Sequence, residues 1–168
     1  MNKNRHRVVF NAARGLRVAV AECSRALGKA STTTAILATA LLPAQAQISA
    51  DPSAPGSQRP TILTAPNGIP LVNIQTPSPA GVSRNTYRQF DVNAPGAILN
   101  NSRTHVQTQL GGWVPGNPWL ASGGARVILN EVNSTNPSYL KGPVEVAGQG
   151  AEVIIANPAG IQIDGGSF

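Results

Sequence analysis

The sequence predicts an all-β protein built as a solenoid of short strands, and three observations lead to this prediction. Helix-breaking residues are spread along the chain, with 14 Pro and 17 Gly among 168 residues, which leaves little room for helices of ordinary length. Short runs that alternate apolar and polar residues lie between these breakers. Small apolar runs ending at or near Asn recur at intervals of about 26 to 30 residues, within the range of solenoid coils.

The recurring runs are Ala97–Asn100, Val127–Asn130 and Val153–Asn157. In a parallel β-helix, each coil buries its inward aliphatic side chains only when the next coil is stacked on it. Turns that contain Asn or Gly let the chain change direction between the strands of one coil. A β-sandwich is the structural alternative, and the repeat alone does not exclude it.

The first 46 residues have the features of an export signal. They contain seven of the 13 Lys and Arg residues and one acid, Glu22, and therefore carry the whole formal net charge of +6. The apolar run Ala35–Leu42 is too short to span a bilayer permanently. Ala44-Gln45-Ala46 is the small-x-small pattern that signal peptidase requires. We therefore expect cleavage after Ala46 and a mature chain that begins at Gln47.

The remainder of the chain has balanced charge, with six basic and six acidic residues. This balance argues against a nucleic-acid-binding surface, which would need an excess of Lys and Arg, so we predict no nucleic-acid partner. Cys23, the only cysteine, lies inside the segment that is removed. The mature chain therefore forms no intramolecular disulfide, although it enters an oxidising compartment.

The mature chain reads as a leader followed by strands. Residues 47–60 are rich in Pro, Ser and Ala and predict a flexible leader. In the segment Thr104–Leu110, Val106 and Thr108 share a face with Leu110, while the polar residues between them take the other face. The strands that these patterns predict are Ile62–Thr64, Ile69–Ile74, Arg88–Val92, Thr104–Leu110, Val144–Val146 and Ile161–Ile163.

Two turns of similar sequence lie in the second half of the chain, Asn117-Pro118-Trp119-Leu120 and Asn157-Pro158-Ala159-Gly160-Ile161. A type I turn favours Asn at its first position, Pro at its second and Gly at its fourth. The second turn meets all three preferences, whereas the first keeps the Asn-Pro opening and ends in apolar residues. Each of them is compatible with an ordinary β-turn.

Taken with their neighbours, these turns resemble the NPNL and NPNGI motifs of a known family. It is the secretion domain at the N-terminus of filamentous haemagglutinins and contact-dependent inhibition exoproteins, which use two-partner secretion. Trp119 and Ala159 stand where that family usually has Asn. The segment Met1–Glu22 resembles the extended signal-peptide region of large exported bacterial surface proteins. Further matches to the family lie at Asn67–Ile74, Gly81–Ser83, Tyr87–Phe90, Leu99–Ser102, Ala121–Gly123 and Arg126–Val132.

The resemblance implies a right-handed parallel β-helix with extra strands capping its N-terminal end. It divides the chain into an extended signal peptide (1–46), a flexible leader (47–60) and the N-terminal part of a two-partner secretion domain (61–168). Because family members continue into many further coils, we expect the β-helix to be incomplete and the chain to be truncated.

The same resemblance implies a route out of a Gram-negative cell. The Sec machinery would export the chain to the periplasm, and signal peptidase would cleave it. POTRA modules of a dedicated outer-membrane β-barrel transporter would then recognise it, and its first coils would nucleate β-helix folding outside the cell. The expected location is the medium or the cell surface. The candidate recognition residues are the two turns, Asn117–Leu120 and Asn157–Ile161.

Two other classes of function stay open. An adhesin module could bind host or bacterial cell-surface glycans or receptors through Trp113 and Trp119, although these side chains could equally cover the open end of the core. A polysaccharide-acting β-helix enzyme would need paired carboxylates or a calcium cage, and the six mature acids are scattered along the sequence. His105 has no Cys or other His to pair with after residue 46. We therefore predict no catalytic residue, no metal and no cofactor.

Overall fold

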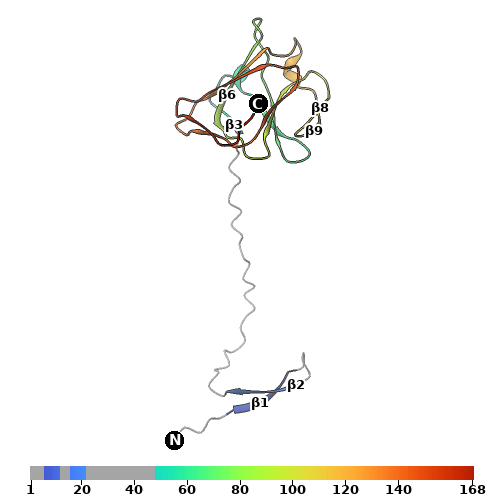
Figure 1. The fold of residues 1–168 in the computed structure, drawn as a ribbon, viewed down its shortest axis with the longest axis vertical. Helices are drawn as coiled ribbons and strands as arrows, with labels where there is room; N and C mark the ends of the chain where they lie inside the picture. Colours follow the sequence, from blue (N-terminus) through green and yellow to red (C-terminus); the bar gives the residue numbers. More distant parts are fainter. Residues whose placement is uncertain (1–5, 12–15, 22–47) are drawn as a thin grey trace. The chain divides into compact units, whose positions relative to one another are not determined.

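The computed structural model describes residues 6–11, 16–21 and 48–168 (Figure 1). The chain divides into two compact units, Met1–Leu41 and Leu42–Phe168. In the first unit, β1 (His6–Asn11) and β2 (Leu16–Ala21) pair as an antiparallel hairpin. The predicted signal apolar run, Cys23 and the cleavage-site residues Ala44, Ala46 and Gln47 lie outside the described residues.

Short strands make up almost all of the regular secondary structure in the described part of the second unit, so the all-β prediction is confirmed. Two 3₁₀ helices, η1 (Gly56–Gln58) and η2 (Pro118–Leu120), interrupt the strands. Among the described residues, no helix is long and apolar enough to cross a membrane. The strands are β3 (Ile48–Ala50), β4 (Thr61–Thr64), β5 (Pro70–Asn73), β6 (Val82–Phe90), β7 (Ala97–Asn101), β8 (Val106–Thr108), β9 (Gly112–Val114), β10 (Val127–Val132), β11 (Ser138–Leu140), β12 (Val144–Gly148), β13 (Glu152–Ala156) and β14 (Ile161–Ile163).

These strands wind into a parallel β-helix, as predicted. In the first sheet, β6, β10 and β13 lie side by side and parallel, with Ile128 of β10 between Ser83 and Val153. Parallel neighbours require a long connection, and here each connection is most of one coil. Strands distant in the sequence are therefore stacked on one wall of the solenoid (Figure 1).

Two further sheets complete the coils. In the second sheet, β7 lies between β5 and β12, and Ile98 is opposite Leu71 on one side and Glu145 on the other. In the third sheet, β11 and β14 pair in parallel, and a single bridge joins Val92 to Leu140. Each turn of the chain therefore contributes one segment to each of three walls.

Antiparallel strands cap the N-terminal end, which confirms the predicted capping strands. In the first sheet, β3 runs antiparallel to β6, and in the second sheet, β4 runs antiparallel to β5. A register shift between Ser49 and Ala50 marks a bulge in β3. Bulges and covering strands are ways in which proteins block the open edges of a sheet.

The flexible leader predicted at residues 47–60 is corrected from Ile48 onward. Ile48 and Ala54 are buried, and Ile48 packs in the main core. The Asp51 carboxylate accepts hydrogen bonds from the backbone N–H of Ser53 at 2.9 Å and from the side-chain amide of Asn133 at 3.1 Å. The Pro- and Ser-rich composition that suggested mobility instead forms compact turns held by side-chain hydrogen bonds.

The main core fills the interior of the coils. Inward side chains from all three sheets meet there, including Phe90 and Ile128 of the first sheet, Leu99 of the second and Leu140 of the third. The rings of Tyr87 and Phe90 pack edge to face, with centroids 4.9 Å apart. Apolar burial of this kind is the main stabilising contribution to the unit.

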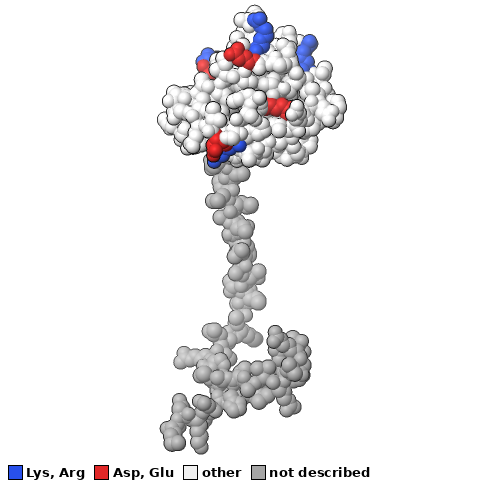
Figure 2. All heavy atoms as spheres, viewed as in Figure 1, with Lys and Arg blue, Asp and Glu red and all other residues white. Residues whose placement is uncertain are grey.

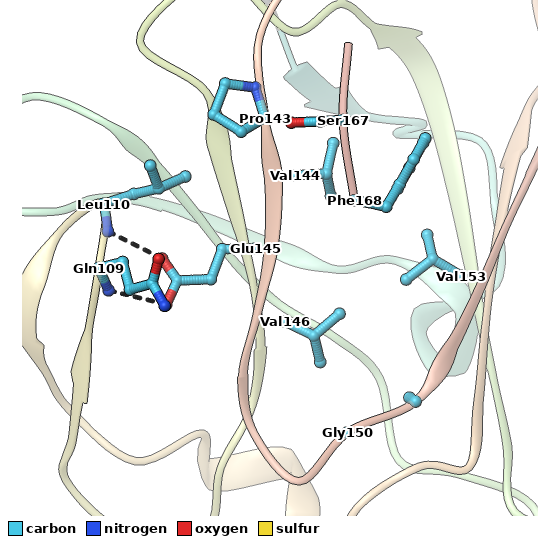
Figure 3. A pocket seen from close by; sticks show the side chains of 11 residues that line it. Gln109, Leu110, Pro143, Val144, Glu145, Val146, Gly150, Val153, Ser167 and Phe168 are labelled. Atoms are coloured by element: carbon cyan, nitrogen blue, oxygen red, sulfur yellow. Dashed lines mark hydrogen bonds between the residues drawn. The ribbon is translucent and has the colours of Figure 1, made fainter.

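A second core lies on the outer face of the second sheet. Residues 102–126, called here the excursion, leave the solenoid between β7 and β10 and include the antiparallel hairpin β8–β9. Val114 of this hairpin packs in one buried cluster with Leu71 and Ile98. The Glu145 carboxylate accepts hydrogen bonds from the backbone N–H groups of Gln109 and Leu110, both at 2.8 Å (Figure 3). The excursion is therefore a cover that is fastened to the sheet.

The last described coil leaves its inward face open. Ile161 and Ile163 lie opposite the buried Ser138 and Leu140, yet they are 39% and 63% exposed. A hollow of about 480 Å³ lies between β12, β13 and Phe168 (Figure 3). The apolar side chains at this end have the pattern of a coil on which a further coil could stack.

Candidate functional site

The first Asn-Pro turn is held by Asn117, whose carboxamide uses both of its ends. Its Oδ1 accepts a hydrogen bond from the backbone N–H of Trp119 at 3.0 Å, which caps the helix η2. Its Nδ2 donates to the carbonyl oxygens of Ile74 and Asn100, each at 2.9 Å. Ile74 follows β5 and Asn100 belongs to β7, so one side chain joins two consecutive coils to the excursion. Asn117 is only 3% exposed.

The other residues of the first turn divide between core and surface. Leu120 is fully buried in the main core. Pro118 is exposed, and Trp119 is 43% exposed, with its indole Nε1 donating to the hydroxyl oxygen of Thr61 at 3.1 Å. The expected β-turn is here a 3₁₀ helix, in which Leu120 N–H donates to the Asn117 carbonyl at 3.3 Å.

The second Asn-Pro turn has the predicted chemistry of a type I turn. The N–H of Gly160 donates to the carbonyl of Asn157 at 3.0 Å, and Gly160 has a φ of +105°, which favours glycine. The Asn157 Oδ1 accepts from the N–H of Ala159 at 2.8 Å. Its Nδ2 donates to the Asn136 carbonyl and to the Ser138 hydroxyl, both at 3.0 Å.

The two turns therefore share one arrangement, although they lie in different coils. In each, the side-chain oxygen of Asn caps its own turn, and the side-chain nitrogen reaches the preceding part of the solenoid. Only an amide side chain both accepts and donates in this way, so Asp could not replace it. Trp119 and Ala159, which depart from the usual Asn of the family, are exposed and leave these bonds intact.

Two adjacent asparagines that sequence reasoning assigned no role close the base of the excursion. Asn101 accepts from the N–H of Ala125 at 2.7 Å and donates to the carbonyls of Ala125 at 2.9 Å and Gln149 at 2.7 Å. Asn100 donates to the Asn73 side chain at 2.8 Å and to the Pro115 carbonyl at 2.9 Å. The only local signal was the Asn-Asn pair at the end of an apolar strand.

Further asparagines line the interior of the first sheet. Asn85 accepts from the N–H of Gln75 at 2.8 Å, and Asn130, its neighbour in the sheet, accepts from the Tyr87 hydroxyl at 2.9 Å. Burial raises the pKa of the Tyr87 phenol, which keeps it a neutral donor. Within the described residues, every buried side-chain nitrogen and oxygen has a hydrogen-bond partner, which is the condition under which buried polar groups are tolerated.

Several acidic side chains fasten loops or join neighbouring strands. Glu131 forms an ion pair with Arg84 on the outer face of the first sheet. Asp91 accepts from the Gln89 side-chain amide at 2.6 Å and from the N–H of Tyr139 at 2.9 Å. Among the described residues, no group of three or more His, Cys, Asp and Glu side chains could hold a metal ion. Charged side chains are few on the face seen in Figure 2, and both signs occur there.

The two tryptophans occupy different places. Trp113 in β9 is 66% exposed, and Trp119 bonds to Thr61 of the N-terminal cap. Neither lines the hollow at the open end, so the suggestion that they cover that end is corrected. His105 is an exposed loop residue next to β8.

Comparisons with known proteins agree with this geometry. Residues 46–168 match the family model of the TPS secretion domain, and residues 1–51 match that of the Extended Signal Peptide of Type V secretion system. A crystal structure of a filamentous hemagglutinin secretion domain superposes with a TM-score of 0.63 at 39% identity, covering 71% of this chain and 38% of that one. Its likeness extends to the β-helix fold.

Much longer relatives carry a similar segment. Toxin CdiA of Yersinia pestis is 52% identical over 100% of this chain, and tRNA nuclease CdiA-2 of Burkholderia pseudomallei is 45% identical over the same share. Filamentous hemagglutinin of Bordetella pertussis is 38% identical over 98% of the chain. The chain spans only 5% or 6% of the length of these relatives.

Proposed function

Since the chain belongs to the TPS secretion domain family and carries an extended signal peptide, we propose that POTRA modules of a dedicated outer-membrane β-barrel transporter recognise it before it folds. Proteins with these two segments are secreted or stay at the surface of Gram-negative bacteria. The family is a secretion domain and not an enzyme family. Export by the Sec machinery and cleavage after Ala46 by signal peptidase precede the encounter with the transporter.

The observation that carries the proposal is the burial of Asn117. A side chain that is 3% exposed and bonded to two coils is closed to a partner in the folded domain. Recognition of the Asn117 side chain therefore requires an unfolded chain, in which the short strands still have free backbone donors and acceptors. Such strands can add to the exposed sheet edge of a POTRA module.

After passage through the pore, the same turns act as folding elements. Asn117 closes the second coil against the first, and Asn157 fastens the third coil to Asn136 and Ser138 of the second. The open inward face around Ile161 and Ile163 then offers an apolar template for further coils in longer family members. Burial of each new coil opposes return of the chain into the pore. Folding outside the cell therefore drives the chain outward without ATP.

Secretion in a bacterium with and without the matching transporter tests this function. We expect the wild-type chain in the medium only when the transporter is present. Asn157→Ala and Pro158→Ala should reduce the secreted amount, whereas Asn93→Ala, at an exposed Asn outside both turns, should not. Equal amounts in the medium with and without the transporter would overturn the proposal.

A second candidate function, glycan binding, is favoured by one observation. Trp113 is 66% exposed on the hairpin β8–β9, and exposed indoles stack on sugar rings. Binding of cell-surface glycans that quenches tryptophan fluorescence and is lost in Trp113→Ala would support it. Secretion unchanged in that variant would separate this role from export.

A further inference from the structure

The turn between β4 and β5 contains the only Asn-Gly pair in the sequence, Asn67-Gly68. Both residues are exposed, and Gly68 has a φ of +88° with open space where a side chain would stand. Glycine places no side chain next to its own backbone nitrogen. This nitrogen can therefore approach the side chain of the preceding residue more freely than the nitrogen of a residue with a Cβ can. The pair therefore combines a carboxamide with an unhindered neighbouring nucleophile.

We propose that Asn67 is a site of self-modification, which converts it to aspartate or isoaspartate while the chain is unfolded. The backbone nitrogen of Gly68 attacks Cγ of Asn67, loses its proton to water and forms a five-membered succinimide as ammonia leaves. A water molecule then adds to one of the two ring carbonyls and opens the ring. Overall, one amide and one water give one carboxylic acid and one ammonia, so the reaction needs no oxidant and no enzyme.

The folded turn restrains both reacting groups. The N–H of Gly68 donates to the carbonyl of Ala65 at 2.9 Å. The Asn67 Oδ1 accepts from the N–H of Ile69 at 3.4 Å, and its Nδ2 donates to the carbonyl of Leu110 in the excursion at 2.5 Å. The attack requires these bonds to break, so it is confined to the fraction of molecules in which the turn has opened.

The three asparagines that precede Pro after residue 46 are protected by their sequence. Asn117, Asn136 and Asn157 are each followed by Pro, whose backbone nitrogen carries no hydrogen. This nitrogen cannot form the neutral succinimide, so these three residues do not take this route even in an unfolded chain. Asn67 thus records time spent unfolded, while the three asparagines that precede Pro keep their amides.

Modification of Asn67 also weakens the turn between β4 and β5. Aspartate lacks the Nδ2 donor and would hold a carboxylate against the Leu110 carbonyl, where the amide now bonds. Isoaspartate lengthens the backbone within a tight turn that sets the register of β4 against β5. A chain that waits too long before folding therefore loses one fastening between the N-terminal cap and the excursion.

Mass spectrometry of the full chain tests the proposal. The protein is kept at neutral pH with and without urea, its folded state is followed by circular dichroism, and the tryptic peptide that ends at Arg84 is sequenced. We expect conversion of Asn67 in urea, slower by about tenfold or more in the folded protein because the turn must open. Asn73, in the same peptide but followed by Ile, is the internal control.

A variant tests the chemistry apart from the fold. In urea, Gly68→Val should slow conversion of Asn67, because the branched side chain crowds the attacking nitrogen. Equal rates for Asn67 with and without native structure, or conversion of Asn73 as fast as Asn67, would overturn the proposal. So would an unchanged rate in Gly68→Val.

Discussion

The carboxylate of Asp51 accepts a hydrogen bond of 3.1 Å from the side-chain amide of Asn133, 82 positions later in the chain. Asp51 follows β3 in the N-terminal cap, whereas Asn133 follows β10 in the second coil. The N-terminal cap of the second unit is therefore joined to a coil that would leave a pore much later, if the chain passed through it from the N-terminus. In a chain that leaves a pore N-terminus first, the cap cannot be completed until residue 133 is outside.

The stability of this junction should depend on pH. The hydrogen bond from the Ser53 side chain, followed by those from the Ser53 backbone and Asn133, lowers the pKa of Asp51 below its usual value. A lowered pKa in the folded state means that ionised Asp51 stabilises the fold. Its contribution is present above the unfolded pKa of about 3.9 and is lost as the pH falls through the lower folded pKa.

Thermal unfolding of the wild type and of Asp51→Asn, measured from neutral pH to below about pH 4, checks the sign of this pH dependence. The wild type should be the more stable protein at neutral pH, and the difference should shrink below about pH 4. Arg88, which also lowers this pKa, should be kept intact in both proteins. A difference that grows on acidification would contradict the assignment.

Replacing Asn117 should destabilise the domain, because its amide satisfies two carbonyls in a buried place. We expect Asn117→Ala to lower the free energy of unfolding by about 1–3 kcal/mol for the groups left unpaired. Asn117→Asp should cost more, since its carboxylate would face the Ile74 and Asn100 carbonyl oxygens.

Urea unfolding measures both changes, with Asn93→Ala and Asn93→Asp as matched controls at an exposed position. The controls should stay within about 0.5 kcal/mol of the wild type. An Asp variant at position 117 as stable as the Ala variant would show that the amide nitrogen is dispensable.

Local chemistry in the sequence was enough to predict several elements. The alternation at Thr104–Leu110 predicts the strand β8, in which Thr108 is buried and Gln107 exposed. The second Asn-Pro turn closes through its first and fourth residues, Asn157 and Gly160, as the turn preferences require. These features depend on residues close together in the chain.

The stacking order could not be predicted from spacing, and the proposed repeat was partly wrong. Ala97–Asn100 and Val127–Asn130 were expected at equivalent places, yet the first lies in the second sheet and the second in the first sheet. The excursion between them lengthens one coil, and similar apolar runs end in Asn on two walls. Only the later pair stacks, with Ile128 opposite Val153.

The role of Asn101 was invisible for a related reason. Its two carbonyl partners, Ala125 and Gln149, lie 24 and 48 positions away. One belongs to the end of the excursion and the other to the next coil, so no local pattern identifies them. A buried amide of this kind is recognised only once the chain has been folded around it.

Adjacent residues of the first turn should respond differently to substitution. Leu120 is fully buried, so Leu120→Ala should cost about 2–5 kcal/mol of stability. Trp119→Asn, which restores the residue that the family usually has, removes an exposed indole and its bond to Thr61, and should cost less than about 1 kcal/mol. Chemical denaturation of both variants measures this difference in lost stability. A Trp119 variant as unstable as the Leu120 variant would contradict the prediction.

Removing the Glu145 carboxylate should loosen the excursion without unfolding the solenoid. Its carboxylate is the shared acceptor for the N–H groups of Gln109 and Leu110, so Glu145→Ala leaves both without this partner. We expect faster tryptic cleavage after the exposed Arg103 in that variant, since opening of the hairpin exposes the scissile backbone. Limited proteolysis with quantitative mass spectrometry measures the rate.

The matched control is Glu152→Ala, which removes an exposed carboxylate from β13 at the outer face of the first sheet. Cleavage after Arg103 should be unchanged in this control, because Glu152 bonds to the excursion through its backbone N–H, which donates to the Arg126 carbonyl at 2.9 Å and is kept in the Ala variant. Equal acceleration in both variants would point to a general loss of stability. A rate in Glu145→Ala equal to that of the wild type would mean that the remaining contacts, including the packing of Val114 against Leu71 and Ile98, hold the excursion without this carboxylate.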